Sequence, residues 1–128
     1  MRKLMVMVAL VAVLVPMVAV AALADGALVQ CNNVLPCVAS GDNDKVLERQ
    51  GDSLRDDIVL KGGSDLVLAN KYTADRDEVS GGTGRDKINV ADGDKRDTAN
   101  GGKGRDICIV DAKREAGTSC ASVQVVRP

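Results

Sequence analysis

The 128-residue sequence contains no histidine, phenylalanine or tryptophan, and it has one tyrosine. The commonest general base of enzymes is therefore missing, and neither a G-x-S-x-G nucleophile elbow nor a G-x-x-x-x-G-K-[ST] phosphate loop occurs. Without aromatic rings the chain has no surface on which bases or sugars could stack. Its net charge of −1 provides no basic surface for nucleic acid. These absences argue against an enzyme and against a nucleic-acid-binding protein.

A long hydrophobic run occurs at the N-terminus, where two cations, Arg2 and Lys3, precede an apolar stretch at 4–23 that is interrupted by Pro16. Ala22 and Ala24 give the small-x-small form of a signal-peptidase site. We therefore expect residues 1–24 to be a secretory signal peptide and the mature protein to be secreted, with no membrane association after cleavage. The alternative is an uncleaved N-terminal helix that anchors the chain, because the run could nearly span a bilayer.

Glycine and aspartate are concentrated in two nonapeptides, GGTGRDKIN at 81–89 and GGKGRDICI at 101–109. Both follow the pattern G-G-x-G-x-D-x-U-x, in which U is apolar, and this pattern is typical of a parallel β-roll that binds calcium. Glycine lets the backbone turn through positive φ and direct carbonyl oxygens toward a cation. The aspartate adds a hard carboxylate ligand of the kind that calcium prefers.

The spacing of aspartates extends the repeat beyond the nonapeptides. An aspartate precedes an apolar residue by two places at Asp44, Asp56, Asp65, Asp77, Asp86, Asp97 and Asp106. Alternate members of this series lie about 20–21 residues apart, which predicts one coil made of two strands and two unequal turns. The apolar residues at the second place are Val46, Ile58, Val67, Val79, Ile88, Ala99 and Cys108. We therefore predict an all-β fold over 41–111, a parallel β-roll or β-solenoid of about three to four coils.

The two sets of turns differ in composition. Turns that end at Asp44, Asp65, Asp86 and Asp106 carry the glycines, whereas the turns GDSLRD, YTADRD and DGDKRD have one glycine or none. We therefore expect a cation on the glycine-rich side, best between 81–86 and 101–106, and none on the glycine-poor side. An arginine also precedes the repeat aspartate at Arg55, Arg76, Arg85, Arg96 and Arg105. In the alternative interpretation these arginines pair with the aspartates in place of a metal, although such exposed pairs are weak.

All four cysteines lie beyond the expected signal, at Cys31, Cys37, Cys108 and Cys120. An even count in a small secreted chain favours disulfides. Of the three possible pairings we favour Cys31–Cys37 with Cys108–Cys120, because each pair brackets one end of the array and solenoid ends need caps. Residues 25–40 and 112–128 would then form the N-terminal cap and a C-terminal cap strand. Free thiols and a zinc site are the alternatives.

The region 41–111 resembles the hemolysin-type calcium-binding repeat family (repeats-in-toxin, RTX), most specifically at 81–89 and 101–109. The resemblance implies a β-roll that folds with calcium, here with one or two Ca²⁺ ions. Carried over by position, the implied metal ligands are Asp86 and Asp106 with the backbone of Gly82, Gly84, Gly102 and Gly104, together with Asp65 and Gly63. The chain departs from the family pattern where Asp75 and Lys95 occupy a position that is normally glycine.

The expected function is that of a small secreted calcium-binding β-roll with a structural or adhesive extracellular role. The alternative is a metal-free extracellular solenoid that binds a protein or glycan partner along one face. Calcium or EDTA added during thermal unfolding would distinguish the two, because a ligand of the native state raises its stability.

Overall fold

The computed structural model describes residues 28–31, 36–48, 55–71 and 75–126. The expected signal peptide and residues 51–54 of the first glycine-poor turn lie outside the described residues. None of the helical structure within the described ranges has the length and apolarity that a membrane span needs. Its elements in chain order are β1 (Leu28–Cys31), β2 (Cys37–Val38), β3 (Lys45–Glu48), β4 (Asp57–Val59), β5 (Gly62–Gly63), β6 (Leu66–Leu68), β7 (Glu78–Ser80), β8 (Thr83–Gly84), β9 (Lys87–Asn89), β10 (Thr98–Asn100), β11 (Lys103–Gly104), β12 (Ile107–Val110), the 3₁₀ helix η1 (Lys113–Glu115) and β13 (Ser122–Val125).

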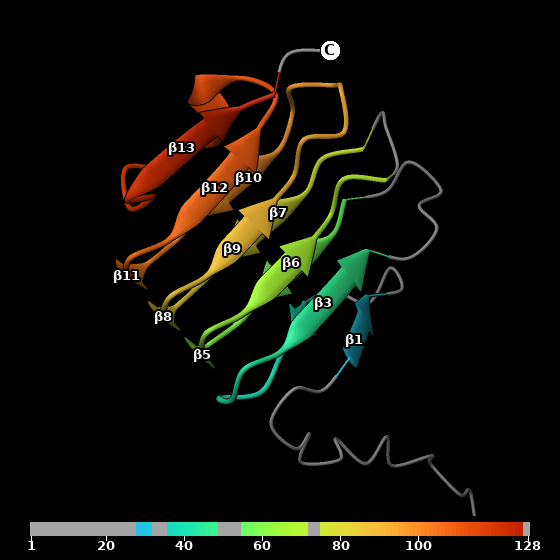
Figure 1. The fold of residues 1–128 in the computed structure, drawn as a ribbon. Coiled ribbons are helices and arrows are strands. Elements are labelled where there is room, and N and C mark those ends of the chain that lie inside the picture. Colours follow the sequence, from blue (N-terminus) through green and yellow to red (C-terminus); the bar gives the residue numbers. More distant parts are fainter. Residues whose placement is uncertain (1–27, 32–35, 49–54, 72–74, 127–128) are drawn as a thin grey trace, which may run out of the picture.

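The strands wind into a parallel β-solenoid, as the sequence predicted (Figure 1). Three sheets run along the solenoid, in the orders β1-β3-β6-β9-β12-β13, β10-β7-β4-β2 and β11-β8-β5. The register advances by one coil at each pairing: Leu66 pairs with Lys45 on one side and with Lys87 on the other, and Lys87 pairs with Ile107. Sequence separations of 21 and 20 residues between hydrogen-bonded coils confirm the predicted period.

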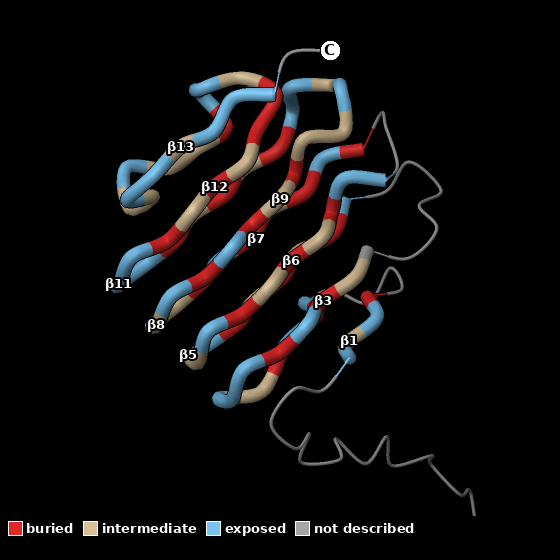
Figure 2. The backbone as a smooth tube through the Cα atoms, viewed as in Figure 1, coloured by how far each residue is buried: buried red, intermediate tan, exposed pale blue. Residues whose placement is uncertain are grey.

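The core is a narrow column of small apolar side chains between the six-stranded and four-stranded sheets. Every residue predicted at the second place after a repeat aspartate is 0 % exposed, from Val46 to Cys108. Figure 2 shows this as buried positions that recur at the same place in successive coils. Because each coil contributes only short side chains, no aromatic ring would fit between the sheets without forcing them apart.

The three-stranded sheet differs from the predicted coil of two strands, in which the glycine-rich segments are turns without strands. In the structure they form β5, β8 and β11, which stack in register. Positive φ angles at Gly84 (131°) and Gly104 (145°) allow this. A Cβ built on Gly104 would lie 1.6 Å from the carbonyl oxygen of Gly84. Successive turns can therefore approach closely enough to hydrogen-bond only because these positions have no side chain.

Disulfides close both ends of the solenoid, with the predicted pairing. Cys31 is bonded to Cys37 and Cys108 to Cys120, with Cα–Cα distances of 5.6 Å and 5.9 Å. Within the loop that the second disulfide closes, Ala116 forms a bridge to Ala99 of β10. After Cys120, β13 adds to the edge of β12. We call residues 111–126 the C-terminal cap, because they cover the ends of the six-stranded and the four-stranded sheet.

Candidate metal centre

The repeat aspartates form two buried columns, one beside each set of turns. In both columns a carboxylate oxygen accepts a hydrogen bond from the backbone N–H of the aspartate one coil earlier. On the glycine-rich side Asp44, Asp65 and Asp86 donate to Asp65, Asp86 and Asp106 at 2.7, 2.9 and 2.9 Å. On the glycine-poor side Asp56 and Asp77 donate to Asp77 and Asp97 at 3.1 and 2.8 Å. All seven residues are at most 3 % exposed. The spacing of the repeat therefore serves backbone bonding between coils.

The glycine-rich column contains the aspartates that the RTX resemblance implied as ligands. One oxygen each of Asp65, Asp86 and Asp106 is buried without a hydrogen-bond partner. Burial raises the pKa of Asp65, and it raises the pKa of Asp86 to about 6, where the charges of the neighbouring aspartates add to the effect. Calcium ligation by these carboxylates stays a prediction.

Of the glycines implied as ligands, Gly63, Gly84 and Gly104 lie in the three-stranded sheet, and Gly82 and Gly102 directly precede its strands β8 and β11. The carbonyl oxygen of Gly82 accepts the N–H of Lys103 at 2.7 Å, and the carbonyl of Lys61 accepts the N–H of Thr83 at 3.1 Å. One lone pair of each of these carbonyls is therefore directed along the solenoid toward the next coil. The carbonyl of Gly82, which the resemblance implies as a calcium ligand, therefore also takes part in backbone bonding between turns.

The arginines that precede the repeat aspartates lie on the surface. Arg55, Arg76, Arg85, Arg96 and Arg105 are exposed, whereas the aspartates that follow them are buried. Arg55 pairs instead with Glu78, at 2.6 Å between Nη2 and Oε2, and both side chains are 47 % exposed. The repeat aspartates are thus held by backbone amides of neighbouring coils. In the alternative interpretation they would instead pair with the arginines that precede them.

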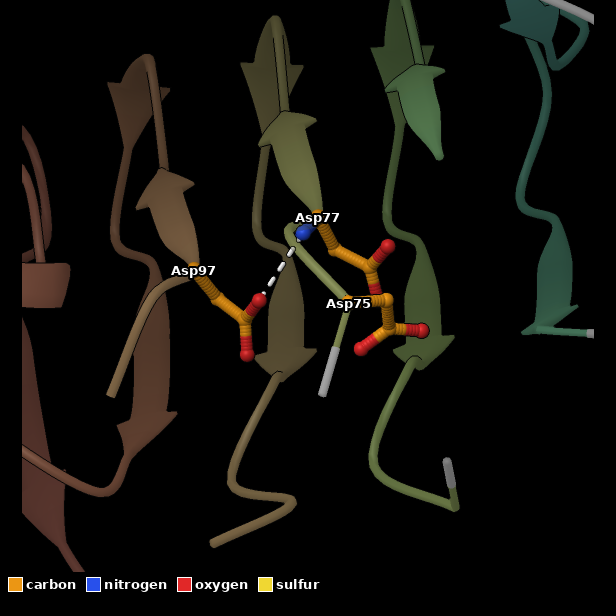
Figure 3. Close-up of side chains that lie close together, drawn as sticks. All are labelled: Asp75, Asp77 and Asp97. Atoms are coloured by element: carbon orange, nitrogen blue, oxygen red, sulfur yellow. Dashed lines mark hydrogen bonds between the residues drawn. The ribbon is translucent and has the colours of Figure 1, made fainter. Parts of the chain in front are cut away.

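A second set of carboxylates converges on the glycine-poor side, where no metal was expected. Three overlapping groups each bring one oxygen from three residues within 4.8 Å of one another. The groups are Asp75–Asp77–Asp97, Asp75–Asp92–Asp94 and Asp94–Asp97–Glu115. We call these six residues the acidic cluster. Figure 3 shows the first group, with the Asp75 and Asp77 carboxylates close together and the Asp97 carboxylate facing them from the next coil.

Local turn chemistry places these side chains. Asp92 accepts the N–H of Asp94 at 2.9 Å, and Asp94 accepts the N–H of Arg96 at 2.7 Å. Such side-chain-to-backbone bonds two residues apart are typical of aspartate turns. Gly93, at φ 108°, allows the reversal between the two aspartates. The turn therefore fixes one oxygen of each carboxylate and leaves the other to face the cluster.

Glu115 enters the cluster from the C-terminal cap. It is the last residue of η1, and its side chain is 2 % exposed. Its Oε2 accepts the N–H of Ala112 at 2.8 Å, while Oε1 is buried without a hydrogen-bond partner. The cap therefore contributes a carboxylate oxygen to a site that otherwise belongs to the coils.

The cluster holds more buried negative charge than its hydrogen bonds compensate. Six of its oxygens are buried without a partner: both of Asp75 and one each of Asp92, Asp94, Asp97 and Glu115. Burial raises the pKa of Asp97 to about 8 and that of Asp92 to about 6, and the charges of neighbouring aspartates add to both shifts. A dense set of hard oxygen donors with these raised pKa values suits a divalent cation that replaces the protons.

The sequence contains a signal for this cluster. The turns D-R-D at 75–77 and D-G-D at 92–94 carry an extra aspartate two places from another. In the family pattern Asp75 is only a departure from glycine. Its role becomes visible once adjacent coils are stacked, since Asp77 and Asp97 are neighbours in space and 20 residues apart in sequence. Glu115 lies outside the repeat, so the period could not place it.

Comparison with known proteins gives no relative for this chain. No family model matches it, and neither a curated protein nor a solved structure matches it. The resemblance to the RTX family therefore depends on the two nonapeptides. The case for a metal centre depends on the geometry of the carboxylates.

Proposed function

We propose that this protein is a calcium-binding β-solenoid and that its calcium centre is the acidic cluster. The observation that carries the proposal is the Asp75 side chain, which is 3 % exposed and has no hydrogen-bond partner for either oxygen. An ionised carboxylate buried without compensation costs several kcal/mol. A bound cation would remove that cost, and the surrounding carboxylates supply the remaining ligands.

The donor chemistry supports calcium over other metals. The six side chains of the acidic cluster are all carboxylates. Zinc sites usually include histidine or cysteine, and this chain has no histidine while its cysteines form disulfides. Magnesium usually keeps several waters and takes one or two carboxylates, whereas calcium accepts six to eight oxygens in flexible geometry. A crowded carboxylate site therefore matches calcium best.

The biological role that we propose is structural or adhesive, outside the cell. Extracellular calcium modules typically bind with a Kd of about 10⁻⁴–10⁻³ M. Binding in that range would stabilise the coils where calcium is abundant. Where calcium is scarce, the carboxylates of the acidic cluster would repel one another. The N-terminal signal-like segment and the two disulfides support an oxidising, extracellular setting.

Thermal unfolding of the oxidised protein tests the proposal. For a site with a Kd of about 10⁻⁴ M, 1 mM calcium should stabilise the native state by about 1.4 kcal/mol relative to EDTA. In a domain of this size that corresponds to a rise in Tm of about 6–10 °C. Equal melting temperatures in calcium and EDTA would contradict the proposal and favour the metal-free solenoid.

A matched pair of variants assigns the side that binds. Asp97→Asn and Asp86→Asn both keep the oxygen that accepts the backbone N–H of the preceding coil, at 2.8 and 2.9 Å in the native protein. Asp97 belongs to the acidic cluster and Asp86 to the glycine-rich column. We expect Asp97→Asn to remove most of the calcium-dependent rise in Tm and Asp86→Asn to retain it. The reverse result would place calcium at the glycine-rich turns.

A further inference from the structure

The acidic cluster has two parts that differ in where their ligands come from. The Asp75–Asp77–Asp97 group belongs entirely to the coils, whereas the Asp94–Asp97–Glu115 group includes a residue of the C-terminal cap. Asp97 is common to both groups. Asp97 Oδ1 accepts the N–H of Asp77, while Oδ2 is buried without a partner. A single carboxylate oxygen can bridge two cations, so the shared residue does not limit the cluster to one ion.

Hydrogen bonds hold the cap against the turn that carries Asp94 and Asp97. The Asp111 carboxylate accepts the N–H of Gly93 at 2.6 Å, and Arg114 donates to the carbonyl of Lys95 at 3.2 Å. Farther along, the N–H of Gly117 donates to the carbonyl of Ala99 at 2.8 Å. These contacts fix the backbone on both sides of Glu115 and direct its free Oε1 into the cluster.

The same segment is closed covalently. The disulfide between Cys108 and Cys120 spans 12 residues, and Glu115 lies within that loop. Cys108 is 0 % exposed in the core, so the bond ties the cap to the last coil directly. Reduction of the disulfide would increase the conformational freedom of the loop. Calcium binding would then have to order Glu115, and the entropy lost in doing so would weaken the calcium affinity.

We propose that a second calcium ion binds at Asp94, Asp97 and Glu115, and that this ion and the Cys108–Cys120 disulfide stabilise each other. The inference rests on the proposed function, because it assigns a further ion to the same acidic cluster. Two ions would bring four positive charges to six carboxylates. By thermodynamic linkage, a disulfide that favours the calcium-bound cap must be harder to reduce when calcium is present.

Calcium titration tests the number of ions. Isothermal calorimetry of the oxidised protein should give two calcium ions per chain, and Glu115→Gln should give one. Asp94→Asn provides a second variant that keeps the acceptor for the N–H of Arg96, and Asp42→Asn is an exposed control. One ion in the native protein and in Glu115→Gln would overturn the second site and leave the proposed function intact. No calcium binding in any form would overturn the proposed function itself.

Disulfide reduction tests the linkage. In a buffer of reduced and oxidised dithiothreitol, the Cys108–Cys120 bond would be converted to two thiols while reduced dithiothreitol is oxidised to its cyclic disulfide. Once the exchange reaches equilibrium, alkylation followed by peptide mass spectrometry would measure the reduced fraction of each bond. We expect calcium to shift the equilibrium of Cys108–Cys120 with dithiothreitol about fivefold or more toward the disulfide, and Glu115→Gln to lose that shift. The bond between Cys31 and Cys37, at the other end of the solenoid, is the internal control. An equal shift of both bonds, or a shift that persists in Glu115→Gln, would contradict the linkage.

Discussion

Replacing Asp75 by asparagine should raise stability in the absence of calcium, and this gain should shrink or reverse when calcium is present. The native carboxylate is 3 % exposed, neither oxygen has a hydrogen-bond partner, and it belongs to two of the three convergent groups. Asparagine keeps the size of the side chain and removes one negative charge. In EDTA the change should therefore relieve repulsion between carboxylates that have no cation between them.

The expected magnitude follows from the burial. Relief of an uncompensated buried group contributes about 1–3 kcal/mol, so the Tm of Asp75→Asn in EDTA should rise by about 4 °C or more. In calcium the variant lacks a ligand and should lose most of the stabilisation of about 1.4 kcal/mol expected for the native protein at 1 mM. The difference in Tm between variant and native protein should therefore shrink or change sign when calcium is added.

Differential scanning calorimetry at pH 7.5, in EDTA and in millimolar calcium, measures both differences. Asp42→Asn is the control, because Asp42 is exposed and a surface change of this kind should alter stability by less than about 0.5 kcal/mol. If Asp75→Asn lowers the Tm equally in both buffers, the Asp75 carboxylate makes a favourable contact in the metal-free protein. The buried Asp75 carboxylate would then not be an uncompensated charge.

Three further perturbations test the columns, the turns and the effect of pH. Asp86→Ala leaves the buried N–H of Asp65 without its acceptor and should cost about 1–3 kcal/mol in urea unfolding; Asp86→Asn retains the acceptor, and equal losses from the two variants would show that the bond does not matter. Gly104→Ala should cost more than Gly93→Ala, since both have positive φ but a Cβ meets a carbonyl only at Gly104; similar losses would show that the turns can separate. Burial raises the pKa of Asp97 from 3.8 to about 8, so the folded protein keeps a proton that the unfolded chain releases. Metal-free protein should thus lose stability as pH rises through that interval, and an EDTA-treated sample with a higher Tm at pH 8 than at pH 5 would contradict the assignment.

Much of the fold could be predicted because the spacing of the repeat determines the length of each coil and the residues that stack between coils. A step of 20 or 21 residues, an aspartate and an apolar residue two places later are enough to place Val67 above Val46 and below Ile88. Cysteines outside or at the edge of the repeat then indicated the two disulfides correctly. Each of these features depends on local spacing, which a single sequence displays directly.

The candidate site could not be predicted in the same way, because its residues come from different coils and from the cap. The family pattern directed attention to glycine turns, where the sequence match is strongest. Asp75 departs from that pattern, and Glu115 lies outside the repeat altogether. Only the stacking of coils brings these two residues into one cluster with Asp94 and Asp97.

The contrast between the two sides has a common physical origin in the packing of turns. Where glycines remove the side chains, successive turns approach and hydrogen-bond as a third sheet, through the carbonyls of Lys61 and Gly82 among others. Where aspartates replace them, the turns are held by side-chain bonds such as Asp92 to Asp94, and the remaining oxygens face the neighbouring coil. In a turn of the first kind, backbone groups alone form the hydrogen bonds to the turn of the next coil. A turn of the second kind presents carboxylates to carboxylates, so it needs a proton or a cation between coils. The glycine-poor turns are therefore the side on which calcium should have the larger effect on stability.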